Sequence, residues 1–174
     1  MRRLMLAAAL VLGRRVGFGR EPMKPHNLTL VMVGAGLLWF GWFGFNAGSA
    51  LAANNTAAIV LVNTLLAGCT GLLAWLAVER FRDGHATSFG AASGVVAGLV
   101  AITPAAGFAH PGTAIILGAV ASLVCFFFVT TVKNKLRYDD SLDVFGVHCI
   151  GGIVGAIGTG IVAAPALGGQ GFFD

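Results

Sequence analysis

The sequence predicts an all-α protein that crosses a membrane several times. Only 10% of its 174 residues are charged and 57% are hydrophobic, and the hydrophobic residues gather in long uninterrupted runs. Soluble domains carry about 25% charged residues, so the polar residues of this chain are too few to cover a surface in water. A helix needs about 20 apolar residues to cross the hydrocarbon core of a bilayer. The long runs therefore predict membrane-spanning helices.

Five runs have the length of a complete span, and we expect helices at 28–50, 56–78, 88–109, 112–132 and 142–164. None of them alternates with the period of two that a strand would show, and all are far longer than the roughly 10 residues of a barrel strand. Isolated strands would also leave backbone groups without partners in lipid. The predicted fold class is a polytopic membrane helical bundle.

A shorter run at 4–12 allows two interpretations. Arg2 and Arg3 precede a short apolar core, which is the charge order of a signal peptide. No small-residue cleavage site follows this core, however, and cleavage would export a strongly basic segment. We expect instead a partial helix, the end of a span whose beginning lies outside the chain.

The basic residues predict the orientation of the bundle. Alternate linkers hold nine of the eleven basic residues: Arg14, Arg15, Arg20, Lys24, Arg80, Arg82, Lys133, Lys135 and Arg137. The linkers on the opposite side hold none. Basic loops stay in the cytoplasm during membrane insertion, so this side is predicted to be cytoplasmic. The net charge is +4, but the basic residues are confined to short loops. This pattern indicates a surface that faces a membrane and no nucleic-acid partner.

The chain shows no motif typical of an enzyme, a metal site or a nucleotide cofactor. Cys69, Cys125 and Cys149 lie within apolar runs and lack CxxC spacing. The patterns GxxxxGK[ST], GxSxG and HExxH are absent from the sequence. We expect no enzyme activity, no metal and no cofactor.

One ionisable residue, His148, lies well inside a predicted span, within the stretch DVFGVHCIGG. Polar groups inside a membrane are costly and usually face a cavity or a partner. The imidazole would either line a pore, where it can relay a proton near neutral pH, or bond to a neighbouring helix in a purely structural role. Residue type and position leave both open, and the adjacent Gly146, Gly151 and Gly152 favour room for a lumen.

Aromatic residues gather in LLWFGWFGFNAGSA at 37–50. Aromatic belts are common where helices leave the membrane, but ring faces also attract small cations by about 0.5–2 kcal/mol each. Asn46 and Ser49 follow the rings and favour a polar entrance. In the next span, Asn63 and Thr64 are expected to form hydrogen bonds between helices.

Small residues recur at four-residue spacing within several predicted spans. Such ladders let helix backbones approach closely in lipid, where the hydrophobic effect does not drive association. This structural signal identifies no function. The ladders are Gly44 and Gly48, then Gly90, Gly94 and Gly98, then Gly151 and Gly155.

Three stretches resemble the ammonium transporter family, whose relatives include the Rhesus glycoproteins: KPHNL at 24–28, GWFGFNAGSA at 41–50 and DVFGVH at 143–148. The similarity covers essentially residues 10–172. It implies a family fold of eleven spanning helices, in which two inverted-topology halves of five helices each enclose a narrow pore. In that scheme residues 28–164 are helices six to ten and belong to the second half.

The resemblance also implies roles for residues of the first span. Phe45 matches the phenyl gate of the family, and Ser49 matches the hydroxyl at the outer ammonium site. Leu38 and Trp42 match pore-lining positions. Asn46, within the same motif, is expected to have a structural role.

Further roles are implied for the last span. Val144 matches a pore-lining position, and His148 matches the second member of the family's twin-histidine pair. Asp143 matches the acid of the motif and is expected to cap its helix. The first histidine of the pair belongs to a part of the family fold that precedes residue 1 of this chain.

For the whole protein, the resemblance implies transport of ammonium or ammonia across the plasma membrane by a homotrimer. It also implies a PII-type signal protein as a partner at the cytoplasmic face. The alternative is an ammonium sensor or regulatory membrane protein that acts through such a partner. Binding sites in transporters of this kind form between the two halves, so transport by this chain alone is not expected.

Overall fold

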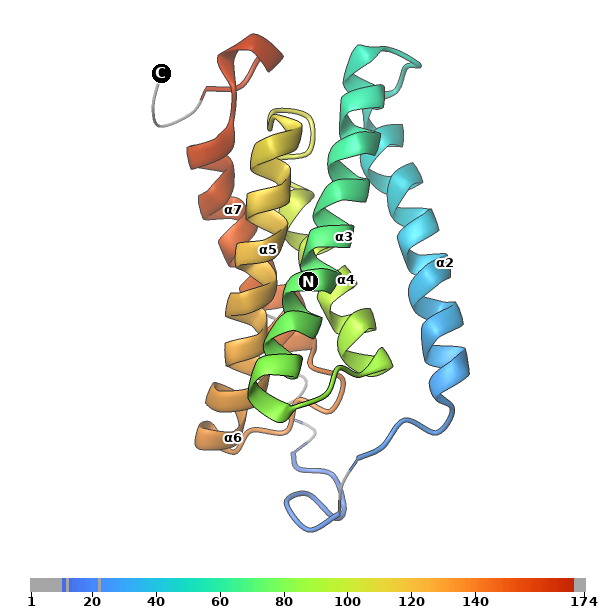
Figure 1. Ribbon diagram of the computed structural model, residues 1–174, viewed down its shortest axis with the longest axis vertical. Helices are drawn as coiled ribbons and strands as arrows, with labels where there is room; N and C mark the ends of the chain where they lie inside the picture. Colours follow the sequence, from blue (N-terminus) through green and yellow to red (C-terminus); the bar gives the residue numbers. More distant parts are fainter. Residues whose placement is uncertain (1–10, 12, 22, 171–174) are drawn as a thin grey trace.

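The computed structural model describes residue 11, residues 13–21 and residues 23–170, and these form a bundle of helices (Figure 1). The predicted all-α fold class is confirmed for this part of the chain. The predicted partial helix at 4–12 lies outside the described residues except for residue 11. The helical elements are α2 (Leu28–Ala47), η1 (Gly48–Ala50), α3 (Asn55–Asp83), α4 (Ser88–Ile102), α5 (Pro111–Phe127), η2 (Phe128–Val132), α6 (Lys133–Leu136), η3 (Phe145–Cys149), α7 (Ile150–Val162) and η4 (Pro165–Leu167).

Side-chain caps set the starts of three helices. The Asn27 side chain accepts a hydrogen bond from the Leu30 backbone N–H at 3.0 Å, and Asn54 does the same for α3. Thr87 Oγ1 accepts from the Gly90 N–H at 2.9 Å. Asn and Thr are favoured at this position because their oxygens satisfy backbone donors that have no partner within the helix. Helix α5 starts instead with a proline, which needs no such partner.

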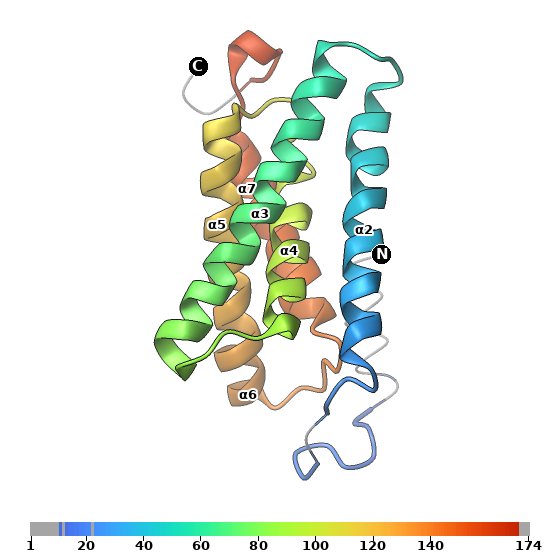
Figure 2. The same cartoon turned by 45° about the vertical axis from the view of Figure 1, so that its right-hand side comes forward.

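Within the described residues, four helical segments are long and apolar enough to cross a membrane: Leu28–Ala50, Asn55–Asp83, Pro111–Leu136 and Phe145–Val162. The chain is therefore a multi-pass membrane protein. The helices run alternately up and down, and the three basic linkers meet at one end of the bundle (Figure 1). Helix α2 stands at the edge of the bundle, beside α3 and α4 (Figure 2).

The region predicted as a fifth span, 88–109, differs from the expectation. Its helix, α4, ends at Ile102 after 15 residues, about 22 Å at 1.5 Å per residue, which is short of the hydrocarbon thickness of about 30 Å. Pro104 contributes to this end because it lacks the N–H that would continue the helix and its ring crowds the preceding turn, although Thr103 before it still has helical φ and ψ. The chain then continues without regular helix to His110.

Asn63 on α3 makes this non-helical segment tolerable inside the bundle. Its side-chain amide donates to the backbone carbonyl of Ala106 at 2.9 Å and to that of Ala109 at 2.7 Å. Both alanines are buried. Irregular backbone occurs at membrane depth only where protein groups satisfy its polar atoms, and Asn63 does so here. Asn63 was expected to bond to another helix; it bonds instead to the non-helical segment between α4 and α5.

Replacing Asn63 with leucine should therefore loosen residues 103–110. Two buried carbonyls would lose their donor, at about 1–3 kcal/mol for each unsatisfied group. We expect faster backbone hydrogen exchange in this segment and a lower free energy of unfolding in detergent micelles. Asn134, which is exposed and bonds only to Thr130 within its own turn, is the control; Asn134→Leu should change neither. Equal exchange in both variants would contradict this role of Asn63.

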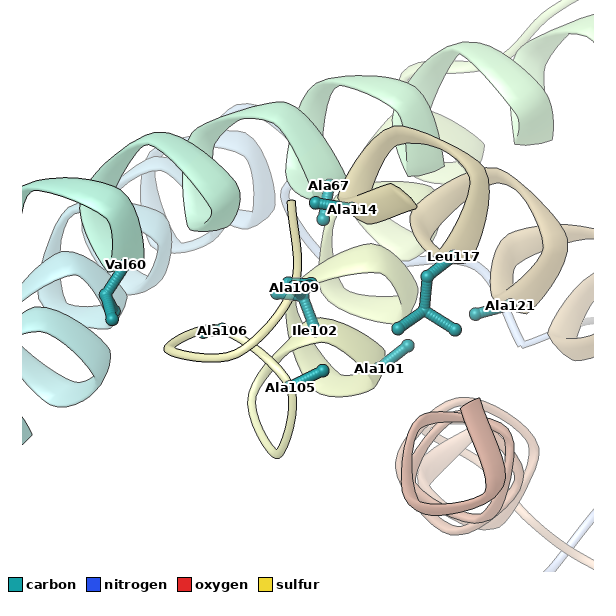
Figure 3. Close-up of a cluster of buried hydrophobic side chains, with 10 residues drawn as sticks. All are labelled: Val60, Ala67, Ala101, Ile102, Ala105, Ala106, Ala109, Ala114, Leu117 and Ala121. Atoms are coloured by element: carbon teal, nitrogen blue, oxygen red, sulfur yellow. The ribbon is translucent and has the colours of Figure 1, made fainter. Parts of the chain in front are cut away.

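The core of the bundle consists mainly of small side chains (Figure 3). Eight of the ten buried residues in its largest cluster are neither large nor aromatic: Ala67, Ala101, Ala105, Ala106, Ala109, Ala114, Ala121 and Val60. Ile102 and Leu117 fill the remaining space. Small residues let α3, α4 and α5 approach until their backbones touch, which fixes the positions of these three helices.

Candidate functional site

A stripe of side chains on α2 carries the predicted residues of the first span. Leu38, Trp42, Phe45 and Ser49 are spaced by four, three and four residues, which places them on one face of a helix. The side chains of Leu38 and Phe45 are 45% and 65% exposed. An exposed apolar stripe of this kind lines the surface of this chain rather than its interior.

Trp42 is held in place by Thr103, a residue that the sequence reasoning did not single out. The indole N–H of Trp42 donates to Thr103 Oγ1 at 2.8 Å, and Thr103 itself donates to the Leu99 carbonyl at 2.7 Å. The ring of Phe45 meets the Trp42 ring edge-on, with centroids 6.2 Å apart. The end of α4 therefore orients the two aromatic residues of the stripe.

Asn46 points away from this stripe and into the bundle. It is buried, and its side-chain amide donates to Thr64 Oγ1 on α3 at 3.0 Å. Thr64 in turn donates to the Val60 carbonyl at 2.7 Å. These bonds tie α2 to α3, so Thr64 has the interhelical role expected of it.

A pocket of about 400 Å³ lies beside Phe45 and Ser49. Its walls come from the end of α2, the start of α3 and the non-helical segment after α4. Ser49 Oγ donates to the Phe45 carbonyl at 2.6 Å, which leaves the lone pairs of this oxygen available as acceptors. The hydroxyl-bearing residues of the pocket are Ser49, Thr56 and Thr103.

The residues predicted on the last span lie in η3, a π-helical turn, and just before it. Val144 precedes Phe145, and His148 is the fourth residue of η3. Both side chains are half-buried. Turns of π-helix are rare and often occur at functional sites. Helix α2, η3 and α7 all pack against α4, so the two groups of predicted site residues lie on elements that contact this short helix.

Two of the three glycines near His148, Gly146 and Gly151, are packed against other helices, which differs from the expectation of free space at these positions. A Cβ atom on Gly146 would lie 2.5 Å from Val129 Cγ2, and one on Gly151 would lie 3.3 Å from Cys125 Sγ. Both positions are filled by other helices of the bundle. These glycines allow η3 and α7 to pack closely rather than leaving space beside the imidazole.

The carboxylate that caps this segment is Asp140 rather than Asp143. Its two oxygens accept from the backbone N–H groups of Val144, Phe145 and Gly146 at 2.9, 2.9 and 3.1 Å. Asp143 has a positive φ of 53°, and its side chain turns to Lys133, whose ammonium group lies 2.6 Å away. The choice depends on the shape of the 137–144 turn, which the linear sequence does not reveal.

Two acids of this turn have shifted pKa values. Burial raises the pKa of Asp143, the Lys133 ammonium offsets this only in part, and the nearby Asp140 adds to the rise. For Asp139, desolvation also acts upward, but the backbone N–H and guanidinium of Arg15 outweigh it and hold the pKa below its ordinary value. Arg15 binds Asp139 through both groups, at 2.8 and 2.9 Å. This bond joins the N-terminal linker to the start of the last span.

The sequence matches a protein-family model described as the Ammonium Transporter Family over residues 4–172. Among curated proteins, it is 54% identical over 164 residues to an ammonium transporter of Aquifex aeolicus, covering 94% of this chain and 38% of that protein. It is 46% identical over 166 residues to an ammonium transporter of Bacillus subtilis, covering 95% of this chain and 41% of that protein.

Solved structures show the same relationship. Saccharomyces cerevisiae Mep2 has a TM-score of 0.84 at 40% identity, over 95% of this chain and 37% of that one. A structure described as a sensor Amt protein has a TM-score of 0.88 at 27% identity, over 95% of this chain and 42% of that one. This chain thus spans about two-fifths of the length of these relatives. On the match over almost its whole length, the chain belongs to the Ammonium Transporter Family.

Proposed function

We propose that this chain forms one wall of a pathway that carries ammonium or ammonia across the plasma membrane. The observation that supports this best is the pocket beside Ser49, which three hydroxyl-bearing residues and Phe45 line together at the end of a hydrophobic stripe. Ammonium is a small cation with only N–H donors. Acceptor lone pairs and an aromatic face are the groups that attract it.

The exposed stripe on α2 supports a shared pathway. Leu38, Trp42 and Phe45 offer no charge that could stabilise an ion, and transfer of an ion into such surroundings costs far more than transfer of a neutral molecule. We infer that the cation gives one proton to solvent water at the mouth of the pocket, that the electron pair of the broken N–H bond stays on nitrogen, and that ammonia moves on past Phe45. The opposite wall comes from groups outside this chain.

His148 and Val144 would line the other part of this pathway. A half-buried imidazole can donate a hydrogen bond to ammonia or accept one from it, and it can take up a proton near neutral pH. The cap by Asp140 and the packing of Gly146 hold the turn that carries it. In this proposal the role of His148 is to conduct the substrate rather than to catalyse a change in its covalent bonds, apart from proton transfer.

Growth of yeast that lacks ammonium uptake, complemented with the full-length protein, tests the proposal. We expect growth on limiting ammonium, and uptake of labelled methylammonium at least about tenfold lower for His148→Ala. Ser49→Ala should raise the half-saturating concentration about tenfold, since a hydrogen bond to a charged group contributes about 1.5–3 kcal/mol.

Ser93→Ala provides the matched control, because Ser93 makes the same bond to the carbonyl four residues earlier but lies outside the pocket. This variant should transport normally. Protein that reaches the membrane yet supports no growth on ammonium would contradict the proposed function. Transport that is unaffected by both Ser49→Ala and His148→Ala would contradict the assigned site.

The proposal extends to orientation and assembly. The basic end of the bundle, where the linkers with Lys and Arg meet, would face the cytoplasm because basic loops are retained there. A homotrimer and a PII-type signal protein at the cytoplasmic face are proposed from the family resemblance. The basic residues at this end would attract a partner with an acidic surface.

A further inference from the structure

A second and larger pocket, of about 730 Å³, lies at the basic end of the bundle. One wall comes from residues 14–21 and Met23 of the N-terminal linker, and the other comes from α6 and the turn that follows it. These segments meet at the same end of the molecule (Figure 1). Pockets of 300–1,000 Å³ hold organic ligands, so this one is much larger than a single inorganic ion requires.

Cationic side chains dominate the walls of this pocket. Five of them face two acids, Glu21 and Asp143. The Lys133 ammonium group binds Asp143 and thereby neutralises one of these acids. The other four cationic residues are Arg14, Arg15, Arg20 and Arg137.

Three of these arginines form no ion pair within the described residues, and the only further acid among those that line the pocket is Glu21. Arg15 is paired with Asp139, but Arg14, Arg20 and Arg137 form no ion pair with any other residue in the described part of the chain. Arg14, Arg20 and Arg137 are exposed to solvent, but cations that line one pocket still create a positive potential there. The pocket is therefore suited to an anion.

Aromatic residues position these cations and add a donor. The guanidinium carbons of Arg14 and Arg15 lie 5.4 and 5.5 Å from the centre of the Phe18 ring, within the range of cation–π attraction. Tyr138 also lines the pocket, and its buried hydroxyl has no hydrogen-bond partner among the described residues. Burial, with Asp140 and Asp143 nearby, raises the pKa of Tyr138 to about 12, so this hydroxyl stays protonated and able to donate.

The position of the pocket indicates the source of the anion. The spanning segment of α2 begins at Leu28 and that of α5 and α6 ends at Leu136, so the pocket lies just beyond the spanning helices, where lipid headgroups are found. Met23 and Phe89 add apolar side chains to the walls. Basic pockets at the ends of spanning helices bind anionic headgroups, and the apolar residues would contact the start of an acyl chain.

We propose that this pocket binds the phosphate headgroup of an anionic phospholipid from the leaflet at the basic end of the bundle. Arg14, Arg20 and Arg137 contact the phosphate oxygens, and the Arg15–Asp139 pair keeps the linker closed over it. The site is separate from the pocket beside Ser49, and its occupation does not depend on the substrate that the protein carries.

Native mass spectrometry of the full-length protein in detergent, with added lipid, tests this proposal. Phosphatidylglycerol should bind more tightly than phosphatidylcholine of the same chain length. Replacing both Arg14 and Arg20 with glutamine should weaken phosphatidylglycerol binding about thirty-fold, at about 1 kcal/mol for each basic residue near an anionic lipid. Lysine at both positions should restore most of it, because the charge is kept.

The matched control removes two charges from the same end of the bundle. Arg80 and Lys135 are exposed and lie outside the pocket, so Arg80→Gln with Lys135→Gln should leave lipid binding nearly unchanged. Equal binding of the two lipids by the unaltered protein would overturn the proposal without the need for any variant. Full competition by inorganic phosphate would also overturn the proposal, because it would indicate a site for free anions. So would an Arg14→Gln, Arg20→Gln variant that no longer binds an acidic protein partner but still binds the lipid.

Discussion

Replacing Gly98 with alanine should lower the free energy of unfolding by about 2–3 kcal/mol, the upper part of the range for overpacked cores. A Cβ atom at this position would overlap the carbonyl of Ala67 on α3. The neighbouring Gly71 and Gly94 are also tightly packed: a Cβ on Gly71 would lie 2.5 Å from the Gly94 carbonyl oxygen, and one on Gly94 would lie 2.7 Å from the Gly71 carbonyl oxygen. Backbone atoms cannot rotate aside as a side chain can, so α3 and α4 would have to separate.

Gly160→Ala is the control for this prediction. Gly160 is also helical, in α7, and a Cβ there would meet nothing within 4 Å. Alanine favours a helix over glycine by up to about 1 kcal/mol, so this variant should be as stable as the original or slightly more stable. Denaturant titration in detergent micelles, followed by circular dichroism, measures both. If Gly98→Ala matched Gly160→Ala in stability, backbone contact between α3 and α4 would not be essential to the bundle.

Replacing Asp140 with alanine should have the second large effect, because one buried carboxylate serves three backbone donors. The N–H groups of Val144, Phe145 and Gly146 would lose their acceptor, at about 1–3 kcal/mol for each donor left without water. The turn that holds His148 would lose its fixed position. We expect a fall of about 3 kcal/mol in stability and a loss of ammonium uptake in the full-length protein.

Asp83→Ala is the control, because Asp83 is an acid that is exposed to solvent and caps none of the described helices. Asp83 pairs with Arg82 at 3.3 Å, and its side chain is 43% exposed. Exposed ion pairs contribute at most about 1 kcal/mol, so this change should leave both stability and uptake close to normal. The stability and uptake of Asp140→Asn should lie between those of Asp140→Ala and Asp83→Ala, since an amide has one acceptor oxygen where the carboxylate has two. An Asp140→Ala variant that transported normally would show that this cap does not control the position of His148.

The helical class and most of the spanning segments could be predicted because lipid imposes a simple rule on the backbone. Every buried N–H and C=O must be satisfied within the chain, so a long apolar run almost requires a helix. The end of α4 was missed because the hydrophobic run continues past Pro104. Only the position of Asn63, which donates to carbonyls 43 and 46 residues away, shows how a non-helical segment can remain buried there.

The candidate site was predictable by residue type and less so by contact. The motif around Trp42 and Phe45 indicated an aromatic lining, but the hydrogen bond from Trp42 to Thr103 joins residues 61 positions apart. Three acids, Asp139, Asp140 and Asp143, were equally close to the start of the last span in sequence. Their separate roles arise from the turn between Arg137 and Asp143, both of which have positive φ, and a linear pattern does not encode that shape.

Because α4 ends early, one side of the pocket beside Ser49 is less able to move than the other. One wall of that pocket is formed by the segment after α4, whose backbone Asn63 anchors through two hydrogen bonds. This backbone does not move when a side chain changes its rotamer. The facing wall belongs to α2, the outermost helix of the bundle (Figure 2). Changes in the width of this pocket are therefore expected to come from α2 and its exposed Phe45 side chain, while the segment that Asn63 anchors keeps its position.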